Sequence, residues 1–468
     1  MRSLIQLVAA GGALTATLST SLALGALASA AAAPAQPGDF NGDGFRDLAI
    51  GAPFGKVGVR TAGYVGVVYG SSSGADTSHR QVLTQNSAGV PGSAESTDQF
   101  GGAVATGDFD GDGFSDLAVG APGEQVSGSD DPGTVTIVFG SRGGLSGTAM
   151  TIASPDTNPE AGSFSSRLVS GDFDRDGLRD LAVSAGAAAA ILYGRAGLRS
   201  STPSLTNIPI GAAVNSLGAG DVTGDGYDEL VVSSTQEDAD DSEIDVFRGS
   251  ASGLAGAAGL GTSSGWARTP IAVGDVNGDH KADIVAGGGF GAPGGSFTLY
   301  PGGAASLDTA HASTWTQDSP GVPGTDESGD RFGAAVAVRD VNGDGFADVA
   351  VGAPGENVGR GGVTLLLGRA TGLTATGAQW FNQGTPGVPG TSEQADSFAG
   401  RVALLDLTRD GRAELVAAVP GENSAAGAVT ILRATASGLT ATGSRTFGAA
   451  TLGADGTRAS FGLALPAE

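Results

Sequence analysis

The chain has no cysteine, few histidines and few basic residues. Without cysteine, neither disulfides nor thiolate metal sites are available to its 468 residues. The three histidines, His79, His280 and His311, stand in no recognisable catalytic setting, which argues against a Ser-His-Asp hydrolase. Lys and Arg number 24 against 49 Asp and Glu, and the net charge of −25 would repel phosphate-rich partners. The composition therefore excludes a disulfide scaffold and argues against nucleic-acid binding.

The first 33 residues have the pattern of a secretion signal. One base, Arg2, precedes a long run of apolar and small residues. We expect cleavage after Ala30 or Ala33, which leaves residues 34–468 as a secreted, extracellular chain. An uncleaved membrane anchor is the alternative, but small residues and then Pro34 follow the apolar run. No later segment approaches the length of a membrane span, and without Arg2 the charge is 23 bases minus 49 acids, −26.

A nine-residue loop recurs seven times along this glycine-rich chain, which has 82 Gly and 20 Pro. The copies begin at residues 39, 108, 172, 221, 275, 340 and 406, and they read DFNGDGFRD, DFDGDGFSD, DFDRDGLRD, DVTGDGYDE, DVNGDHKAD, DVNGDGFAD and DLTRDGRAE. Their spacings run from 49 to 69 residues, which is room for about four short strands with tight turns.

The segments around each loop predict strands. An apolar run such as LAVGAP follows the loop, a Phe-led segment such as FGAAVAVRD precedes it, and GTVTIVFG or GGVTLLLG lies downstream. A fourth, less regular strand fits before the next Phe. One such repeat cannot bury its own faces, so the sequence predicts an all-β fold in which seven four-stranded blades close into a propeller.

The loop itself predicts a calcium site. Positions 1, 3, 5 and 9 offer oxygen side chains, position 7 offers a backbone carbonyl, and Gly at positions 4 and 6 permits a tight wrap. The absence of His and Cys from these ligand positions argues against zinc or copper. A solvated Asn-Gly turn would explain one copy, but it does not explain seven copies with an acid at every ninth position. An EF-hand is excluded because position 12 is apolar in every copy.

The stretch FGAAVAVRDVNGDGFADVAVGAP resembles the FG-GAP repeat of integrin α-subunit N-terminal propellers and their bacterial relatives. The resemblance implies a seven-bladed β-propeller with Ca²⁺ held between the first two strands of some blades. The candidate ligands at positions 1, 3, 5, 7 and 9 of the successive loops are Asp39, Asn41, Asp43, Phe45, Asp47; Asp108, Asp110, Asp112, Phe114, Asp116; Asp172, Asp174, Asp176, Leu178, Asp180; Asp221, Thr223, Asp225, Tyr227, Glu229; Asp275, Asn277, Asp279, Lys281, Asp283; Asp340, Asn342, Asp344, Phe346, Asp348; and Asp406, Thr408, Asp410, Arg412, Glu414.

Not all seven loops match the pattern equally well. The first, second and sixth carry the full set, and the third keeps all four acids although an Arg replaces a Gly. Thr223 and Thr408 are poorer ligands than carboxylates, Glu229 and Glu414 are one methylene longer than Asp, and His280 stands where Gly is favoured. We therefore expect up to seven calcium ions, with three or four sites supported best.

Other features have structural explanations that we favour over functional ones. Trp266, Trp315 and Trp380 could stack on sugars, but the last two occupy similar places in two repeats and are expected to pack within blades. The acidic stretch from Glu237 could hold a cation, but a solvated loop explains it. The loops that contain GVPG could form a binding face, although connections between blades commonly look like this. GSSSG and GTSSG match a hydrolase pattern without the strand-to-helix setting it needs.

These observations predict a monomeric, non-enzymatic protein-binding or cell-adhesion module whose partner is an extracellular protein or glycan. The alternatives are a lectin and a polysaccharide-cleaving enzyme, since a glycosidase needs only two suitably spaced carboxylates.

The ends of the chain predict how the ring closes. No strand fits between the signal and Asp39, whereas Phe461 and Gly462 repeat the Phe-Gly opening with no loop after them. We expect the last residues to supply the missing innermost strand of the first blade, so that N- and C-terminal segments pair. Pro466 cannot donate to a strand ladder, which predicts that pairing stops near Leu465.

Overall fold

The computed structural model describes most of the chain that follows the predicted signal. The described residues are 35–125, 133–154, 164–235, 242–263, 270–288, 293–303 and 308–467. The predicted signal peptide, residues 1–33, lies outside them, and its cleavage stays a prediction. Residues 32–468 form one compact unit, to which all the described strands and helices belong.

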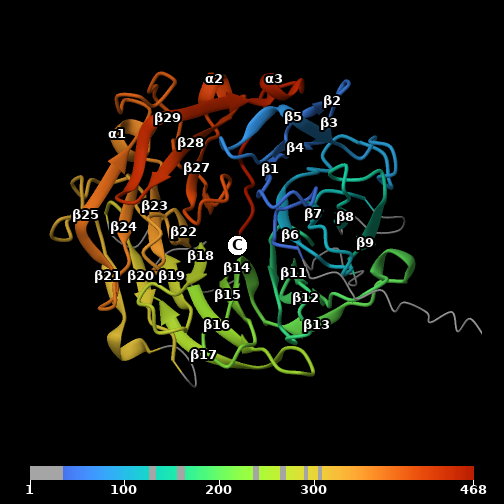
Figure 1. The fold of residues 1–468 in the computed structure, drawn as a ribbon, viewed down its shortest axis with the longest axis horizontal. Helices are drawn as coiled ribbons and strands as arrows, with labels where there is room; N and C mark the ends of the chain where they lie inside the picture. The colour runs from blue at the N-terminus through green and yellow to red at the C-terminus, as the bar shows by residue number, and fades with distance from the viewer. Residues whose placement is uncertain are drawn as a thin grey trace, which may run out of the picture. The chain divides into compact units, whose positions relative to one another are not determined.

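Within the described residues, the strands form seven antiparallel sheets, here called blades 1 to 7 in chain order, and one small hairpin. Figure 1 shows the blades around a common centre, toward which the first strands lie. The blades are β1, β4, β5 (Leu48–Ala52, Tyr64–Tyr69, Asp76–Leu83); β6 to β9 (Ala103–Gly107, Asp116–Ala121, Thr134–Val138, Ala149–Ala153); β10 to β13 (Leu168–Gly171, Asp180–Ala185, Ala188–Leu192, Thr206–Pro209); β14 to β17 (Ala213–Gly220, Glu229–Thr235, Ser242–Arg248, Ala255–Ser263); β18 to β21 (Ile271–Gly274, Asp283–Gly287, Phe297–Tyr300, Ser313–Trp315); β22 to β25 (Ala335–Arg339, Asp348–Ala353, Gly362–Leu367, Thr374–Phe381); and β26 to β29 (Val402–Leu405, Glu414–Val419, Ala428–Thr435, Gly438–Gly448). The remaining elements are the hairpin β2 (Lys56–Val57) and β3 (Arg60–Thr61), the helices α1 (Glu356–Gly359), α2 (Glu422–Ala425) and α3 (Ala449–Leu452), and the 3-10 turns η2 (Leu198–Ser200) and η3 (Thr309–His311).

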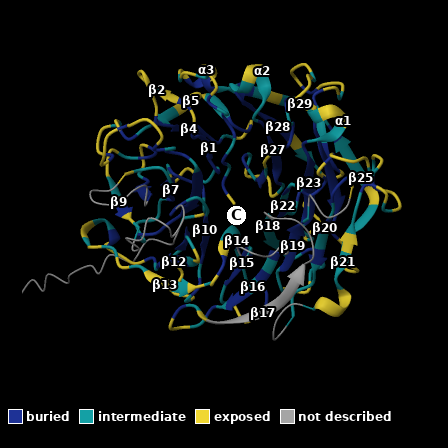
Figure 2. Cartoon of the chain, turned by 180° about the vertical axis from the view of Figure 1, so that it is seen from behind, coloured by how far each residue is buried: buried dark blue, intermediate teal, exposed yellow. Residues whose placement is uncertain are grey.

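Burial falls from the inner strands of a blade to the outer ones. Every residue of β7 and of β23 is buried, as their continuous apolar sequences predict for strands covered on both faces. The fourth strands carry exposed residues, as β25 does. Figure 2 shows the same gradient, with buried residues toward the centre and exposed ones at the periphery. The predicted four-strand repeat is confirmed, including the irregular outer strand.

Apolar side chains join each blade to the next. Phe100, from the Phe-Gly that opens blade 2, is fully buried in a cluster with Val65 of blade 1 and Val104 and Leu117 of its own blade. Its backbone N–H donates to the Ala62 carbonyl of blade 1 at 2.8 Å. The Phe that opens the repeat is thus an interface residue, which explains why a single repeat would not be stable alone.

The ring closes through the last residues of the chain, as predicted. Blade 1 has three strands of its own, and Ala464 pairs with Gly51 of β1 in an antiparallel bridge. The Gly51 N–H donates to the Ala464 carbonyl at 2.9 Å, and the Gly462 N–H donates to the Gly51 carbonyl at 3.0 Å. Phe461 is fully buried, and its N–H donates to the Ala426 carbonyl of blade 7 at 3.0 Å. This bond is equivalent to the one that Phe100 makes to Ala62 of blade 1. Residues 461–465 therefore stand in for the first strand of blade 1.

Candidate metal-binding loops

The seven predicted loops share one end of the blades. Each loop ends at position 9, where the second strand of its blade begins or is about to begin. In blades 2 to 7 the loop follows the first strand, and because the strands alternate in direction, all these connections lie on the same face of the ring. We call this the loop face.

Backbone amides of each loop converge on the carboxylate at position 1. In the second loop, Asp108 Oδ1 accepts from the N–H groups of Gly111 at 2.7 Å and Asp112 at 3.2 Å, and Oδ2 accepts from Gly113 at 3.0 Å. The φ angles of Gly111 and Gly113 are 73° and 86°, in the left-handed region that favours glycine. The bond from position 6 to Oδ2 of position 1 recurs in all seven loops, at 2.8 to 3.2 Å.

The substitutions at the glycine positions leave this wrap intact. Arg175 and Arg409 at position 4 both have φ of 57°, and His280 at position 6 has φ of 66°. The His280 N–H still donates to Asp275 Oδ2 at 2.9 Å. These residues accept a strained backbone conformation, so the local hydrogen bonds outweigh the preference for glycine.

The acid at position 9 is a buried anchor between strands. Asp116 is fully buried; its Oδ2 accepts from the Phe109 N–H at 3.0 Å and its Oδ1 from the Gly140 N–H at 2.9 Å. Five loops have such a glycine after the third strand, Gly70, Gly140, Gly194, Gly302 and Gly368. A Cβ at Gly140 would lie 2.2 Å from the Ser115 carbonyl oxygen. Sequence reasoning missed this role, although the glycine that recurs after these five third strands was a usable signal.

The carboxylates of a loop are crowded and partly desolvated. Burial, with a smaller contribution from the carboxylates at positions 1 and 3 or 5, raises the pKa of Asp47 to about 8 and that of Asp180 to about 8. Burial also raises the pKa of Asp348 to about 7. An ionised carboxylate in such a place needs a compensating positive charge, which a cation would supply.

Two loops bring three carboxylates within reach of a single ion. Carboxylate oxygens of Asp108, Asp110 and Asp116 lie within 4.8 Å of one another, and those of Asp172, Asp174 and Asp180 do the same in the third loop. Asp172 Oδ1 is buried without a hydrogen-bond partner. The all-oxygen donor set and this unpartnered oxygen fit a hard cation such as Ca²⁺.

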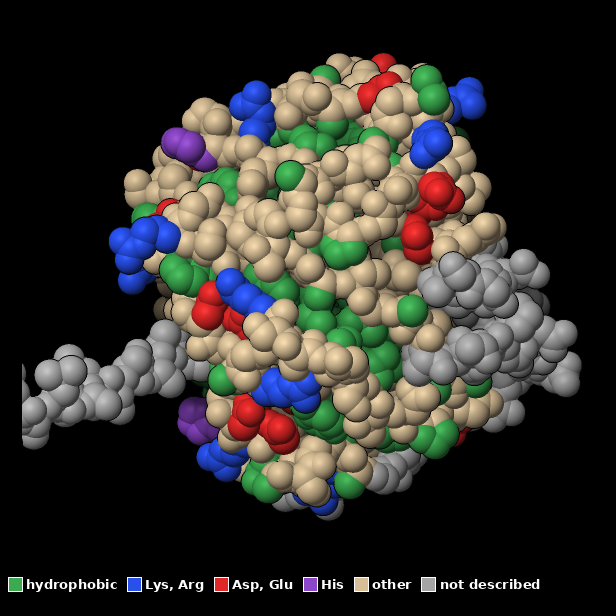
Figure 3. Space-filling model, turned by 90° about the vertical axis from the view of Figure 1, so that its right-hand side faces the viewer, with side chains coloured by type: hydrophobic (Ala, Val, Ile, Leu, Met, Phe, Trp, Pro, Cys, Tyr) green, Lys and Arg blue, Asp and Glu red, His purple; other side chains and the backbone are tan. Residues whose placement is uncertain are grey.

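Basic side chains already contact several of the loops. Arg199, at the centre of the 3-10 turn η2, bonds both Asp110 and Asp112 of the second loop. At position 7, the Lys281 and Arg412 side chains turn back to the position-5 acid of their own loops, each at 3.2 Å. Figure 3 shows acidic side chains beside Lys or Arg on one side of the molecule. A guanidinium that contacts the candidate ligands would compete with a cation for them. The contact from Arg199 was not predicted from the sequence.

Hydrogen bonds link successive loops around the ring. The position-8 N–H of one loop donates to the position-1 carbonyl of the preceding loop, as Ser115 does to Asp39 at 2.9 Å. Six such pairs occur among the described residues, at 2.7 to 3.2 Å: Ser115 to Asp39, Arg179 to Asp108, Asp228 to Asp172, Ala282 to Asp221, Ala347 to Asp275 and Ala413 to Asp340. The residue that would bind metal through its carboxylate is thus tied to the next blade through its carbonyl.

Sequence comparison assigns these repeats to a family. The FG-GAP repeat matches residues 35–69, 100–138, 332–366 and 398–432, and the FG-GAP-like repeat matches residues 172–232 and 221–286. Together the matches include all seven loops and more than half of the chain. The chain is an FG-GAP repeat protein. The predicted resemblance is confirmed.

Three similar proteins illustrate the relationship. The FG-GAP chain is 35% identical over 149 residues to mouse (Mus musculus) phosphatidylinositol-glycan-specific phospholipase D, a match that covers 31% of this chain and 17% of that protein. It is 38% identical over 125 residues to integrin alpha-5 of Xenopus laevis, covering 26% and 10% of the two chains. Its identity to integrin alpha-PS5 of Drosophila melanogaster is 41% over 90 residues, covering 19% and 8%. The matches thus span less than a fifth of each relative.

One solved structure similar to the FG-GAP chain shows the recognition of non-reducing terminal N-acetylglucosamine by an Agrocybe aegerita lectin. It has a TM-score of 0.47 and 15% sequence identity, and the alignment covers 86% of this chain and 89% of that one. A likeness at that score carries no argument about ligand.

In the fourth and seventh loops of the FG-GAP chain, two departures from the pattern occur together, a Thr at position 3 and a Glu at position 9. Thr408 at position 3 directs its hydroxyl to Glu414 Oε1 at 3.3 Å, and Thr223 makes the same bond to Glu229 at 3.3 Å. The longer Glu side chain reaches the Thr at position 3, so two of the predicted ligands are hydrogen-bonded to each other. In the sixth loop, by contrast, both oxygens of Asp348 accept from backbone amides, of Val341 and Gly368, and position 3 is Asn342.

We therefore expect Asp344→Ala to cost more than Asp410→Ala. The first removes a ligand from a full set, and one calcium ion at 100 times its Kd contributes about 2.7 kcal/mol. The second removes an exposed acid that pairs with Arg412, an interaction of at most about 1 kcal/mol. Calcium per chain after gel filtration, and melting with and without EGTA, measure both. Equal losses in the two variants would contradict the ranking.

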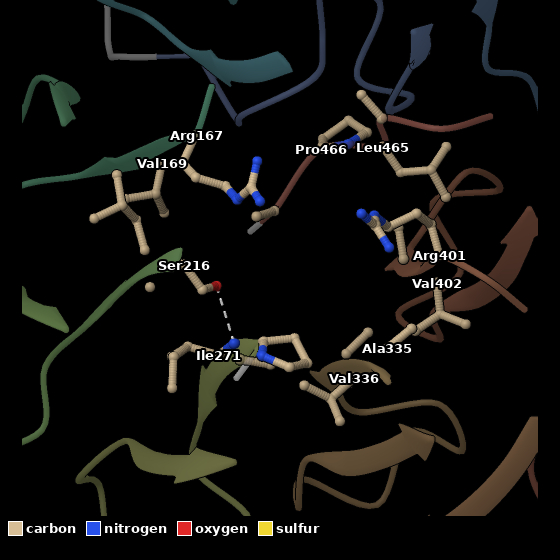
Figure 4. A pocket seen from close by; sticks show the side chains of 18 of the residues that line it. Arg167, Val169, Ser216, Ile271, Ala335, Val336, Arg401, Val402, Leu465 and Pro466 are labelled. Carbon is tan, nitrogen blue, oxygen red and sulfur yellow. Dashed lines mark hydrogen bonds between the residues drawn. The ribbon is translucent and has the colours of Figure 1, made fainter. Parts of the chain in front are cut away.

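A pocket of about 350 Å³ lies at the centre of the FG-GAP ring. Figure 4 shows Arg167 and Arg401 pointing into it beside Leu465 and Pro466. Each arginine immediately precedes the first strand of its blade, β10 or β26. Arg167 Nε donates to the Asn215 carbonyl at 2.6 Å. No sequence signal marked these arginines, because only closure of the ring brings their blades together.

Further sequence candidates are two histidines, the GSSSG segment and Trp315, and of these His79 and Ser71 line a common pocket. His79 pairs with Asp76 at 2.6 Å and His311 with Asp308 at 2.5 Å, both on exposed outer positions. GSSSG joins strands β4 and β5, without a helix. Trp315 stacks on Phe297 with ring centroids 6.4 Å apart, which confirms its packing role.

Trp266 and the start of the acidic stretch from Glu237 lie outside the described residues, whereas the end of that stretch belongs to β16 rather than to a loop. No helix in the described ranges is both long and apolar enough to cross a membrane.

Proposed function

We propose that this chain is a secreted, calcium-stabilised propeller that acts as a non-enzymatic protein-binding or adhesion module. The observation that carries the proposal is the sevenfold loop, which repeats the same wrap of amides around a carboxylate on one face of the ring. Extracellular calcium-binding modules work with Kd values of about 10⁻⁴ to 10⁻³ M, so secretion would keep the loops filled even if each bound calcium weakly.

The loop residues would hold the ion through their oxygens. Asp39, Asp43 and Asp47 would do so in the first loop, with the Asn41 amide oxygen and the Phe45 carbonyl, and the matching positions would do so in the others. Bound calcium supplies positive charge between strands that otherwise place several carboxylates together. The residues themselves fix the turn, because position 1 gathers amides and position 9 joins the loop to the third strand.

A binding role fits the arrangement of polar groups better than catalysis. Among the described residues, His79 and His311 pair with neighbouring acids, and His280 lies in one of the seven loops. His79 lines one pocket with Ser71 of GSSSG, but its ring bonds Asp76 rather than a serine. The integrin-like repeats support adhesion to an extracellular protein, and the likeness to a phospholipase D covers a minor part of that enzyme. We therefore place ligand recognition on the surface of the ring.

The test compares binding and turnover with one protein preparation. Purified residues 34–468 are applied to immobilised fibronectin and collagen and to a glycan array, in calcium and in EGTA. The same protein is assayed for reducing-sugar release from polysaccharides and for release of a glycosylphosphatidylinositol-anchored protein from vesicles. We expect calcium-dependent retention on a protein surface without turnover. Binding only to glycans would favour the lectin alternative, and release of sugar or anchored protein would overturn the non-enzymatic proposal.

A further inference from the structure

A second group of polar residues recurs three times, away from the seven loops, and in each copy a Gln and an Asp are buried. Each copy contains a Gln, two Glu and an Asp, and we call it a glutamine cluster. The three clusters are Gln85, Glu95, Asp98, Glu124; Gln317, Glu327, Asp330, Glu356; and Gln383, Glu393, Asp396, Glu422. In all three, 13 residues separate Gln from Asp and 26 separate Asp from the last Glu. Such constant spacing indicates one structural unit used three times.

The clusters lie on the face opposite the loop face. Gln317 follows the fourth strand of blade 5, Asp330 precedes the first strand of blade 6, and Glu356 lies between the second and third strands of blade 6. These connections leave the strands at the ends opposite the calcium loops. The other two clusters occupy the same places between blades 1 and 2 and between blades 6 and 7.

Hydrogen bonds bring the members of each cluster together. In the middle cluster, Asp330 Oδ2 accepts from the Glu327 N–H at 2.9 Å, and the Asp330 carbonyl accepts from Gly355 N–H at 2.9 Å, which places Glu356 beside it. Gln317 Nε2 donates to Glu356 Oε2 at 2.8 Å. Gln383 makes the same bond to Glu422 at 2.6 Å, and Gln85 makes it to Glu124.

Each glutamine leaves its carbonyl oxygen without a partner. Gln85, Gln317 and Gln383 are 4%, 1% and 4% exposed, and in all three the Oε1 atom is buried and accepts no hydrogen bond. The amide cannot simply turn over, because a carboxylate only accepts and so requires Nε2 to face it. Asp326 Oδ1, near the middle cluster, is buried and unpartnered as well. A buried oxygen without a donor is unfavourable, so a ligand that carries positive charge or a proton is expected there.

The surrounding charges favour a cation over a neutral donor. Burial raises the pKa of Glu356, and the charges of Asp330 and Glu327 raise it further. The pKa of Glu422 is raised in the same way, by burial and by Asp396 and Glu393. Burial also raises the pKa of Asp98 and of Asp396, but the nearby charges of Arg60 and Arg360 oppose this rise and offset part of the negative charge in the outer two clusters. The middle cluster is therefore the best one to test.

We propose that the glutamine clusters are three further sites for a hard divalent cation, Ca²⁺ in a secreted protein, bound through Gln Oε1 and the neighbouring carboxylates. The ligands are oxygens only, as such ions prefer. These sites are separate from the seven loops, because the clusters share no residue with them and lie on the opposite face.

The experiment uses the full mature chain and two changes at one position. Gln317→Leu removes the oxygen, and Gln317→Glu, which is nearly isosteric, replaces it with a carboxylate. If a cation binds, Gln317→Leu lowers calcium per chain by one, and Gln317→Glu keeps the count and tightens that site about tenfold. Asp344→Ala, in the sixth loop, is the matched control. The calcium lost in this variant and the calcium lost in Gln317→Leu should add in the double variant.

A spectroscopic measurement reports on the same site. Trp315 lies two residues before Gln317, so Tb³⁺ bound at the middle cluster should emit on tryptophan excitation. This emission should fall in Gln317→Leu and persist in Asp344→Ala. If water fills the site instead, neither Gln317 variant changes the calcium count or the Tb³⁺ emission, and Gln317→Glu lowers the melting temperature equally with and without calcium. That result would overturn the proposal, and it would do so even if Gln317→Leu failed to fold. It would leave the loop sites untouched.

Discussion

Removal of calcium with EGTA is expected to lower the melting temperature of residues 34–468 by about 15 °C. Three occupied loops at 100 times Kd would together contribute about 8 kcal/mol of folding free energy. A domain of this size shifts by roughly 2 °C per kcal/mol. The chain has no disulfide to compensate, and without metal each loop keeps several carboxylates close together. Filling all seven sites would change the charge of residues 34–468 from −26 to −12.

Differential scanning calorimetry in calcium, in EGTA, and in EGTA followed by excess calcium measures the effect. The third sample should recover the first transition, which separates metal loss from irreversible damage. Magnesium in place of calcium should restore less of the melting temperature lost in EGTA, since Mg²⁺ demands stricter octahedral geometry. A midpoint that EGTA leaves unchanged would show that the loops are turns rather than metal sites.

Deletion of residues 461–468 is expected to destabilise the propeller by more than about 5 kcal/mol and to cause self-association. Loss of a fully buried Phe side chain alone typically costs about 3 to 5 kcal/mol, and Phe461 packs edge-on against Phe447 of β29. The deletion also removes both hydrogen bonds to Gly51 and leaves β1 as an open edge.

Two smaller changes serve as controls for the deletion. Removal of residues 467 and 468 alone should leave melting unchanged, because Ala467 is exposed and the pairing lies at Ala464. The melting temperature of Phe461→Ala should fall between that of the chain lacking 467–468 and that of the chain lacking 461–468. Melting curves and gel filtration report both stability and association. A chain lacking 461–468 that stays monomeric and melts like the full one would contradict closure by the last residues.

The sequence alone predicted most of what is repeated and little of what occurs once. The seven loops, the buried second strands and the pairing of the residues after Phe461 with β1 all follow from patterns within one repeat, and the structure bears them out. Arg199 reaches the second loop from a different blade, and no local pattern marks such a contact. The pocket arginines Arg167 and Arg401 escaped notice for the same reason.

The glutamine clusters are an intermediate case. Their spacing was visible, but Gln317 and Asp330 looked like parts of a polar Pro-Gly connection, for which exposure is the usual expectation. Burial of Gln317 to 1% depends on two blades that pack against each other. The sequence showed which residues recur, whereas their burial and the unpartnered oxygen required the structure.

The hydrogen bonds between successive loops give the ring a direction. From the second loop to the seventh, the position-8 amide donates back to the position-1 carbonyl of the preceding loop. A loop that tightens around an ion would therefore pull on the loop before or after it. The loops then behave as a one-dimensional array with nearest-neighbour coupling rather than as independent binding sites. We expect the calcium-binding curve to be steeper than a sum of separate sites. A variant that breaks one loop should weaken the loops next to it before those across the ring.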